Sequence, residues 1–166
     1  MKKLILVVAV TLISVVSFSQ SPLSVGKNQL NVGVGLSEWG VPIYIGLDHG
    51  ISRDLTIGGE FSFRSYNENW NNNDYKHNII GISANLNYHF NTVLNIPNEW
   101  DFYAGPNLGF YSWSSPDDYT GDKNSGLGIG VQIGGRYFIS NKIGLNFEFG
   151  SGNAFSGGKL GLTFKL

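Results

Sequence analysis

The sequence predicts an all-β fold, an eight-stranded antiparallel up-and-down barrel that crosses a membrane, and three observations lead to it. Eight stretches alternate apolar residues with small or polar ones at the period of two that a strand requires. Most connections between them are short enough for an antiparallel meander. Only 14% of the 166 residues are charged, against about a quarter in soluble domains, which suits a chain that faces something other than water.

The clearest of the eight strands is Gly126–Phe138. Leu127, Ile129 and Val131 share one face of this strand, while Gly and Gln residues alternate with them, so the two faces are unlike. A strand that crosses a bilayer at a tilt of about 45° needs about ten residues, and this one is long enough. The other predicted strands repeat the pattern.

Three strands open the fold. Asn28–Leu36 and Val41–Ile51 set Leu, Val and Ile against Asn, Gly and Asp, with a turn at Ser37–Gly40 between them. Leu55–Tyr66, entered through the tight turn Ser52–Asp54, sets Ile and Phe against Thr, Gly and Ser.

Two more strands precede Gly126. His77–Phe90 follows the polar loop Asn67–Lys76, and Trp100–Trp113 follows the connection Asn91–Glu99. Because proline lacks the N–H that a ladder bond needs, Pro106 predicts a local bulge or a missing bond.

The last two strands follow Phe138. The polar loop Ser114–Asn124 leads into Gly126–Phe138, and the short turn Ile139–Lys142 leads out of it. Ile143–Gly150 and Gly157–Leu166 then alternate Ile, Leu and Phe with Gly, Asn, Glu, Thr and Lys, which completes the eight strands.

Residues 1–19 are predicted to be a secretory signal peptide. Lys2 and Lys3 precede the apolar run Leu4–Phe18, and a small residue precedes a cleavage point before Gln20. The alternative, a membrane-anchoring helix, needs about 20 apolar residues, and this run is shorter. The barrel domain is then residues 20–166, and no cysteine is present to form a disulfide.

The apolar face of the predicted strands is expected to point outward. The opposite face carries Gly, Ser, Asn and Thr and lacks the Lys and Glu of a sheet that faces water. Eight strands leave an interior only wide enough for side chains, which suits small residues there. A soluble barrel would bury the apolar face instead.

These features resemble the small eight-stranded outer-membrane barrel proteins of the OmpX, OmpA transmembrane-domain and porin-like type, as found in Bacteroidetes-like bacteria. The residues that carry the resemblance are the signal sequence ending at Ser19-Gln20, the repeat Asp101-Phe102-Tyr103-Ala104-Gly105, and the terminal Leu160, Leu162, Phe164 and Leu166. The resemblance implies outer-membrane lipid as the surroundings and recognition of the last strand by the barrel-assembly machinery. The family's last residue is usually aromatic, whereas this chain ends in Leu166.

Charged residues on the inward parity predict a plugged interior. They are four acids and four bases: Asp48, Glu60, Arg64, Asp101, Arg136, Glu148, Lys159 and Lys165. An ion-selective pore would show an excess of one sign. Since a desolvated charge must be paired, ion pairs that close the barrel are favoured over a hydrated channel lining.

Strand direction divides these charges into two groups that are each neutral. The inner group is Asp48, Asp101, Arg136 and Lys165, and the outer group is Glu60, Arg64, Glu148 and Lys159. If the two hairpins involved pair up to their loops, Glu148 lies beside Lys159 and Asp101 beside Arg136.

Trp70, Tyr75 and Tyr119 lie among Asn and Asp in the two long loops. Aromatic side chains exposed in polar loops are candidate contacts for an extracellular ligand. The alternative is that they sit in mobile loop tips and have no ligand.

No catalytic or metal site is predicted. The three histidines show no Ser–His–acid arrangement, and no His, Asp and Glu cluster has the spacing of metal ligands. A net charge of −1 excludes a polybasic surface for nucleic acid. We therefore expect no enzyme activity, no cofactor and no nucleic-acid partner.

The sequence thus predicts a monomeric outer-membrane barrel with an ion-paired, plugged interior and a structural or cell-surface interaction role through its extracellular loops. One alternative is a narrow channel for small or hydrophobic solutes. The other is a soluble periplasmic ligand-binding barrel of the lipocalin-like type.

Overall fold

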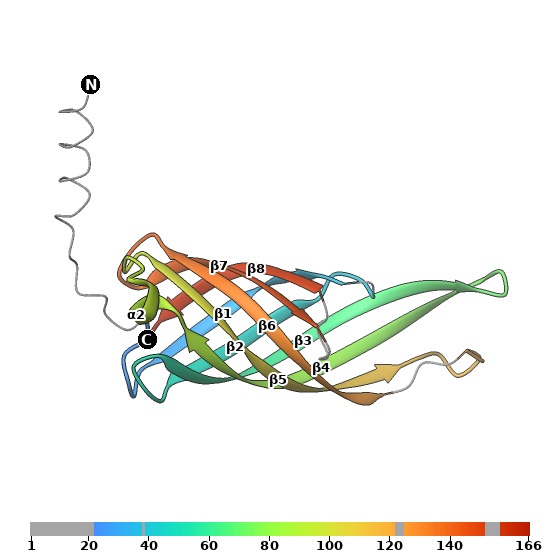
Figure 1. Ribbon diagram of the computed structural model, residues 1–166. Coiled ribbons are helices and arrows are strands. Elements are labelled where there is room, and N and C mark those ends of the chain that lie inside the picture. Colours follow the sequence, from blue (N-terminus) through green and yellow to red (C-terminus); the bar gives the residue numbers. More distant parts are fainter. Residues whose placement is uncertain (1–21, 38, 122–124, 152–156) are drawn as a thin grey trace, which may run out of the picture.

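Eight antiparallel strands, paired in the order of the sequence, close into a barrel in the computed structural model (Figure 1). The structure describes residues 22–37, 39–121, 125–151 and 157–166. The strands are β1 (Asn28–Leu36), β2 (Ile43–Gly50), β3 (Leu55–Trp70), β4 (Asn73–His89), β5 (Trp100–Ser114), β6 (Gly126–Phe138), β7 (Ile143–Ser151) and β8 (Gly157–Lys165). β1 pairs with β8, which closes the barrel and confirms the predicted fold. The predicted signal peptide, residues 1–19, lies outside the described residues.

The barrel has two unlike ends. The turn end carries the short connections 51–54 and 139–142 together with the C-terminus, and the loop end is the opposite one, from which β3 and β4 project (Figure 1). The connection between β4 and β5 at the turn end contains the one-turn helix α2 (Asn91–Leu94). Among the described residues no helix has the length and apolar character needed to cross a membrane.

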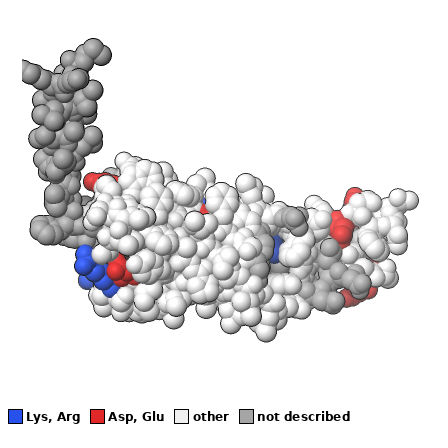
Figure 2. Space-filling model, viewed as in Figure 1, with Lys and Arg blue, Asp and Glu red and all other residues white. Residues whose placement is uncertain are grey.

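The apolar face of the strands points outward, as predicted. On β6 the side chain of Ile129 is 80% exposed, whereas the buried residues of the barrel are mostly polar, with Asp101 at 0% and Arg136 at 2%. Figure 2 shows the result on one face, where charged side chains gather toward the two ends and leave an almost uncharged belt between them. Near the turn end the belt carries aromatic rings, with Trp100 stacked on Phe102 and 4.7 Å from Tyr137 between centroids.

The prediction of a polar loop at Asn67–Lys76 is wrong, because β3 and β4 continue through this segment. They pair up to Trp70 and Asn73 and are joined by a two-residue turn, so the hairpin projects beyond the other strands (Figure 1). Asn71 and Asn72 form the turn with φ of 51° and 64°. Asparagine tolerates this left-handed conformation, which tight hairpin turns require.

Pro106 interrupts the ladder between β4 and β5. The pairing stops at Asn85 and Asn107 and resumes at Tyr88 and Ala104 in the same register. The ladder therefore lacks bonds at this point and contains no bulge, which is the second of the two predicted outcomes. Gly105 lies within the gap together with Pro106, and a Cβ at Gly105 would collide with the carbonyl oxygen of Leu86.

Candidate functional site

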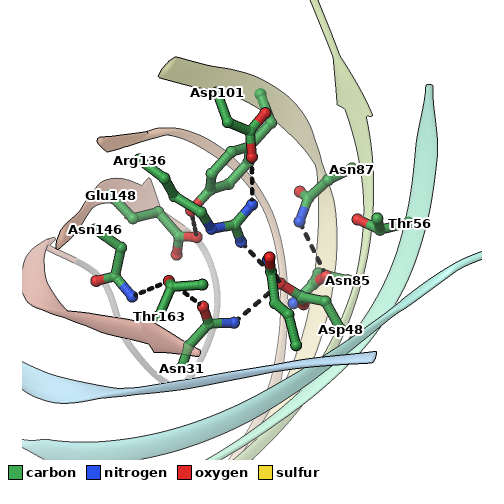
Figure 3. Close-up of polar contacts among 12 residues, drawn as sticks. Asn31, Asp48, Thr56, Asn85, Asn87, Asp101, Arg136, Asn146, Glu148 and Thr163 are labelled. Carbon is green, nitrogen blue, oxygen red and sulfur yellow. Dashed lines mark hydrogen bonds and ion pairs between the residues drawn. The ribbon is translucent and has the colours of Figure 1, made fainter. Parts of the chain in front are cut away.

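Arg136 on β6 forms the centre of a buried ion-paired group inside the barrel. Its Nη1 donates to Asp101 Oδ2 at 2.8 Å and its Nη2 donates to Asp48 Oδ2 at 2.7 Å (Figure 3). Asp101 is on β5, the neighbouring strand, whereas Asp48 is on β2, across the lumen. The three side chains are 0 to 5% exposed. We call Asp48, Arg136 and Asp101 the arginine triad.

Further hydrogen bonds hold the carboxylates of the arginine triad. Asp101 Oδ1 lies 2.7 Å from His89 Nδ1. Because an ionised carboxylate can only accept, that nitrogen carries a proton. The other ring nitrogen of His89 faces Thr56 Oγ1 at 3.0 Å. Asp48 Oδ2 also accepts from two side-chain amides on β1, those of Gln29 at 3.0 Å and Asn31 at 2.9 Å.

Lys159 on β8 forms the centre of a second group with the same composition, two acids around one base. Its Nζ lies 2.8 Å from Glu60 Oε2 on β3 and 2.6 Å from Glu148 Oε1 on β7. Its ammonium also lies 5.3 Å from the centroid of the Tyr44 ring. We call Glu60, Lys159 and Glu148 the lysine triad.

Tyr103 on β5 connects the two triads. Its hydroxyl donates to Glu148 Oε2 at 2.9 Å, and the Arg136 guanidinium carbon lies 4.2 Å from its ring centroid. A polar cavity of about 20 Å³ lies where the two triads meet, and Asp48, Glu60 and Glu148 are among the residues that line it. A space of this size is about what one water molecule occupies.

Amide and hydroxyl side chains fill the lumen around the triads. Gln132 donates to Asn87 Oδ1 at 2.9 Å, and Thr163 donates to Asn31 Oδ1 at 2.6 Å. Tyr44 donates to Asn146 Oδ1 at 2.8 Å, which links β2 to β7 across the lumen. The small and polar parity of the strands therefore fills the lumen with hydrogen-bonded side chains.

Both predicted hairpin registers are confirmed. Glu148 pairs with Lys159 across β7 and β8, and Asp101 pairs with Arg136 across β5 and β6.

Three members of each predicted group, inner and outer, form a triad. Each triad holds two acids and one base, so the expectation that each ion-paired group is neutral is wrong. Two of the predicted bases lie elsewhere. Arg64 donates to Ser37 Oγ at 3.2 Å and lies over the Trp39 ring. The Lys165 ammonium lies 3.7 Å from the Phe138 ring centroid and forms no ion pair with the described residues.

Sequence reasoning identified all six triad residues but missed the contacts between strands that lie far apart in the barrel. Neighbouring strands can be registered from their hairpin, but the contact between Asp48 and Arg136 spans the lumen from β2 to β6. The roles of His89 and Tyr103 were missed as well, although both lie on the inward parity that the alternation indicates.

Trp70, Tyr75 and Tyr119 come together at the loop end. The Tyr119 ring lies 6.3 Å from Trp70 and 5.0 Å from Tyr75 between centroids. Trp70 and Tyr75 lie on the projecting strands, so the prediction that both sit in a loop is wrong. Tyr119 lies in the connection between β5 and β6.

The sequence matches a known protein family over nearly its whole length. The family model described as "Outer membrane protein beta-barrel domain" matches residues 6–165. The chain belongs to this family. As an outer-membrane barrel it lies in the lipid bilayer of the outer membrane, which confirms the predicted location and sets aside the soluble alternative. A comparison with curated proteins finds no match.

Solved structures of low sequence identity share the fold of this outer-membrane barrel. The outer membrane protein OprG from Pseudomonas aeruginosa is 8% identical with a TM-score of 0.63, covering 87% of this chain and 97% of that one. The N-terminal barrel domain of OprF from the same organism is 10% identical with a TM-score of 0.52, at 86% and 98% coverage. A de novo designed transmembrane barrel is 17% identical with a TM-score of 0.54, also at 86% and 98%.

Proposed function

We propose that this outer-membrane barrel is closed to solutes by its two triads and that its role is structural or one of cell-surface interaction through the loop end. The observation that carries the proposal is that each central base bridges strands on different sides of the lumen. Arg136 links β6 to β2, and Lys159 links β8 to β3. A solute that crossed the lumen would have to separate these buried pairs, and breaking a buried pair costs about 3–5 kcal/mol.

Conductance across a planar bilayer tests the plug. The wild-type barrel is expected to give no steady current, whereas Arg136→Ala removes the side chain that crosses the lumen and is expected to give discrete openings. Lys76→Ala is the matched control, because Lys76 is an exposed base on the projecting hairpin. Steady single-channel currents from the wild type would instead establish the narrow-channel alternative.

We also propose that residues 1–19 direct export and are removed, and that the mature barrel is a monomer with its loop end outside the cell. The last strand, β8, alternates outward apolar residues, among them Leu160 and Leu162, with inward ones. This pattern supports recognition of β8 by the barrel-assembly machinery. Mass spectrometry of the mature protein should give an N-terminus at Gln20. A protein that retains Met1 would contradict the cleavage.

A further inference from the structure

The hairpin of β3 and β4 reverses its polarity where it leaves the barrel. Up to Phe63 and Ile80 the outward side chains are apolar and exposed. Beyond those positions the exposed outward side chains are polar: Ser65, Asn67, Asn69, Asp74, Lys76 and Asn78. The inward side chains there are mostly aromatic: Tyr66, Trp70, Tyr75 and His77. The projecting part thus has a polar outer face, which suits contact with water, and an aromatic inner face.

Tyr119 is inserted into this aromatic face from outside the sheet. Its ring makes edge-to-face contacts with Trp70, Tyr75 and His77, the nearest of them His77 at 4.6 Å between centroids. Its hydroxyl donates to Glu68 Oε2 at 2.8 Å. Aromatic rings favour this edge-to-face geometry, and the hydroxyl of a tyrosine packed in this way usually finds a hydrogen-bond partner.

His77 gives the site a polar group that is not fully used. The side chain is completely buried, and its Nδ1 lies 2.8 Å from Ser115 Oγ. Its Nε2 faces Glu68 Oε2 at 3.5 Å, too far for a good hydrogen bond, and has no hydrogen-bond partner among the described residues. Buried polar groups in a purely structural core are normally satisfied, so this nitrogen is available to a ligand hydroxyl.

We propose that Glu68, Trp70, Tyr75 and His77 form a binding site for the phenol ring of a tyrosine in an extracellular peptide, and that Tyr119 is its resident occupant. The proposal rests on the proposed surface-interaction role and names the chemistry of the partner. Tyr119 itself shows that a phenol fits, with its ring against the aromatic walls and its hydroxyl on the carboxylate. A ring without a hydroxyl would lose the hydrogen bond to Glu68, and sites that bond a ligand hydroxyl reject analogues lacking it strongly.

Tyr119 can leave this site without breaking the sheet, because it lies in the connection between β5 and β6. An external tyrosine would then compete with it. When the competent state is only a fraction of the molecules, the apparent affinity falls by that fraction. If Tyr119 occupies the site in about nine molecules of ten, removing its ring strengthens binding about tenfold.

The test is a titration of the full mature barrel in detergent micelles with N-acetyl-tyrosinamide, followed by the NMR signal of the Trp70 indole N–H. Tyr119→Ala is expected to bind the probe with a dissociation constant about tenfold lower than the wild type. N-acetyl-phenylalaninamide, which lacks only the hydroxyl, is the matched probe and is expected not to shift the signal. Adding Glu68→Ala to Tyr119→Ala is expected to abolish binding of the tyrosine probe.

Heat-dependent gel migration and an unchanged Trp100 indole signal would establish that each variant is a folded barrel. If folded Tyr119→Ala binds neither probe, or binds both equally, the cluster is only a small core and the proposal fails. Should Tyr119→Ala not fold, Tyr119→Phe carries the test, because it loses the bond to Glu68 and is expected to bind the tyrosine probe more tightly than the wild type. Equal affinity of Tyr119→Phe and wild type would overturn the proposal.

The same reagents separate this proposal from the broader one. Adhesion of the barrel to cells or matrix that excess N-acetyl-tyrosinamide does not inhibit would overturn the phenol site and leave the surface role standing. Adhesion that the tyrosine probe inhibits and the phenylalanine probe does not would support both. The conductance test of the plug does not depend on Tyr119.

Discussion

The guanidinium carbon of Arg136 lies 4.2 Å from the ring centroid of Tyr103, whose hydroxyl donates to Glu148. One side chain therefore contacts the base of the arginine triad with its ring and an acid of the lysine triad with its hydroxyl. Tyr103→Phe keeps the ring contact and removes only the hydroxyl. We expect it to lower the free energy of unfolding by about 1.5–3 kcal/mol, the value of a hydrogen bond to a charged group. Urea unfolding in detergent micelles measures this, and an unchanged midpoint would contradict the link.

Arg136→Met should be more damaging, because it leaves the buried carboxylates of Asp48 and Asp101 without their shared base. The expected loss is about 3–5 kcal/mol in the same urea experiment. Adding Asp48→Asn and Asp101→Asn removes the two unpaired charges and should recover most of the lost free energy of unfolding. Lys76→Met, an exposed change on the hairpin, should stay within about 0.5 kcal/mol of the wild type. A triple variant less stable than Arg136→Met would argue against this account.

Gly105→Ala should destabilise the barrel, because the added methyl group would meet the carbonyl oxygen of Leu86 on β4. Such overpacking typically costs about 1–3 kcal/mol. Gly59→Ala is the control, since a Cβ there meets nothing nearer than the Ser83 carbonyl oxygen at 3.7 Å. Thermal unfolding of the two variants should separate them, and equal midpoints would show that β4 can move away at the gap beside Pro106.

Asn72→Val should loosen the tip of the β3–β4 hairpin. Asn72 has a φ of 64°, a conformation that costs a β-branched residue about 1–2 kcal/mol or more. Asn72→Gly should keep the turn, since glycine adopts positive φ freely. Hydrogen exchange of the amides in residues 66–77 is expected to accelerate in the valine variant and to stay slow in the glycine variant. Equal exchange in both would mean that the turn does not limit opening.

The alternation of apolar and polar residues and the closure of hairpins sufficed to predict the barrel, its outward apolar face and the pairing of Asp101 with Arg136. Each of these features depends on residues that are close in sequence or joined by one turn. The triads depend on which strands face each other across the lumen, and no local pattern contains that information. The hairpin tip was missed for a different reason. From Tyr66 onward the period of two continues while its polarity reverses, and a polar outward face of this kind predicts a loop as readily as a strand.

The polarity reversal on β3 and β4 also fixes how deeply the protein is immersed. Moving the barrel toward its turn end would carry Asn67 and Asp74 into hydrocarbon, and moving it the other way would lift Phe63 and Ile80 into water. Both displacements are unfavourable, and the aromatic rings of Trp100 and Tyr137 prefer the headgroup level at the opposite surface. The membrane surface at the loop end is therefore expected to meet the hairpin just beyond Phe63, which leaves the aromatic face with Tyr119 in water.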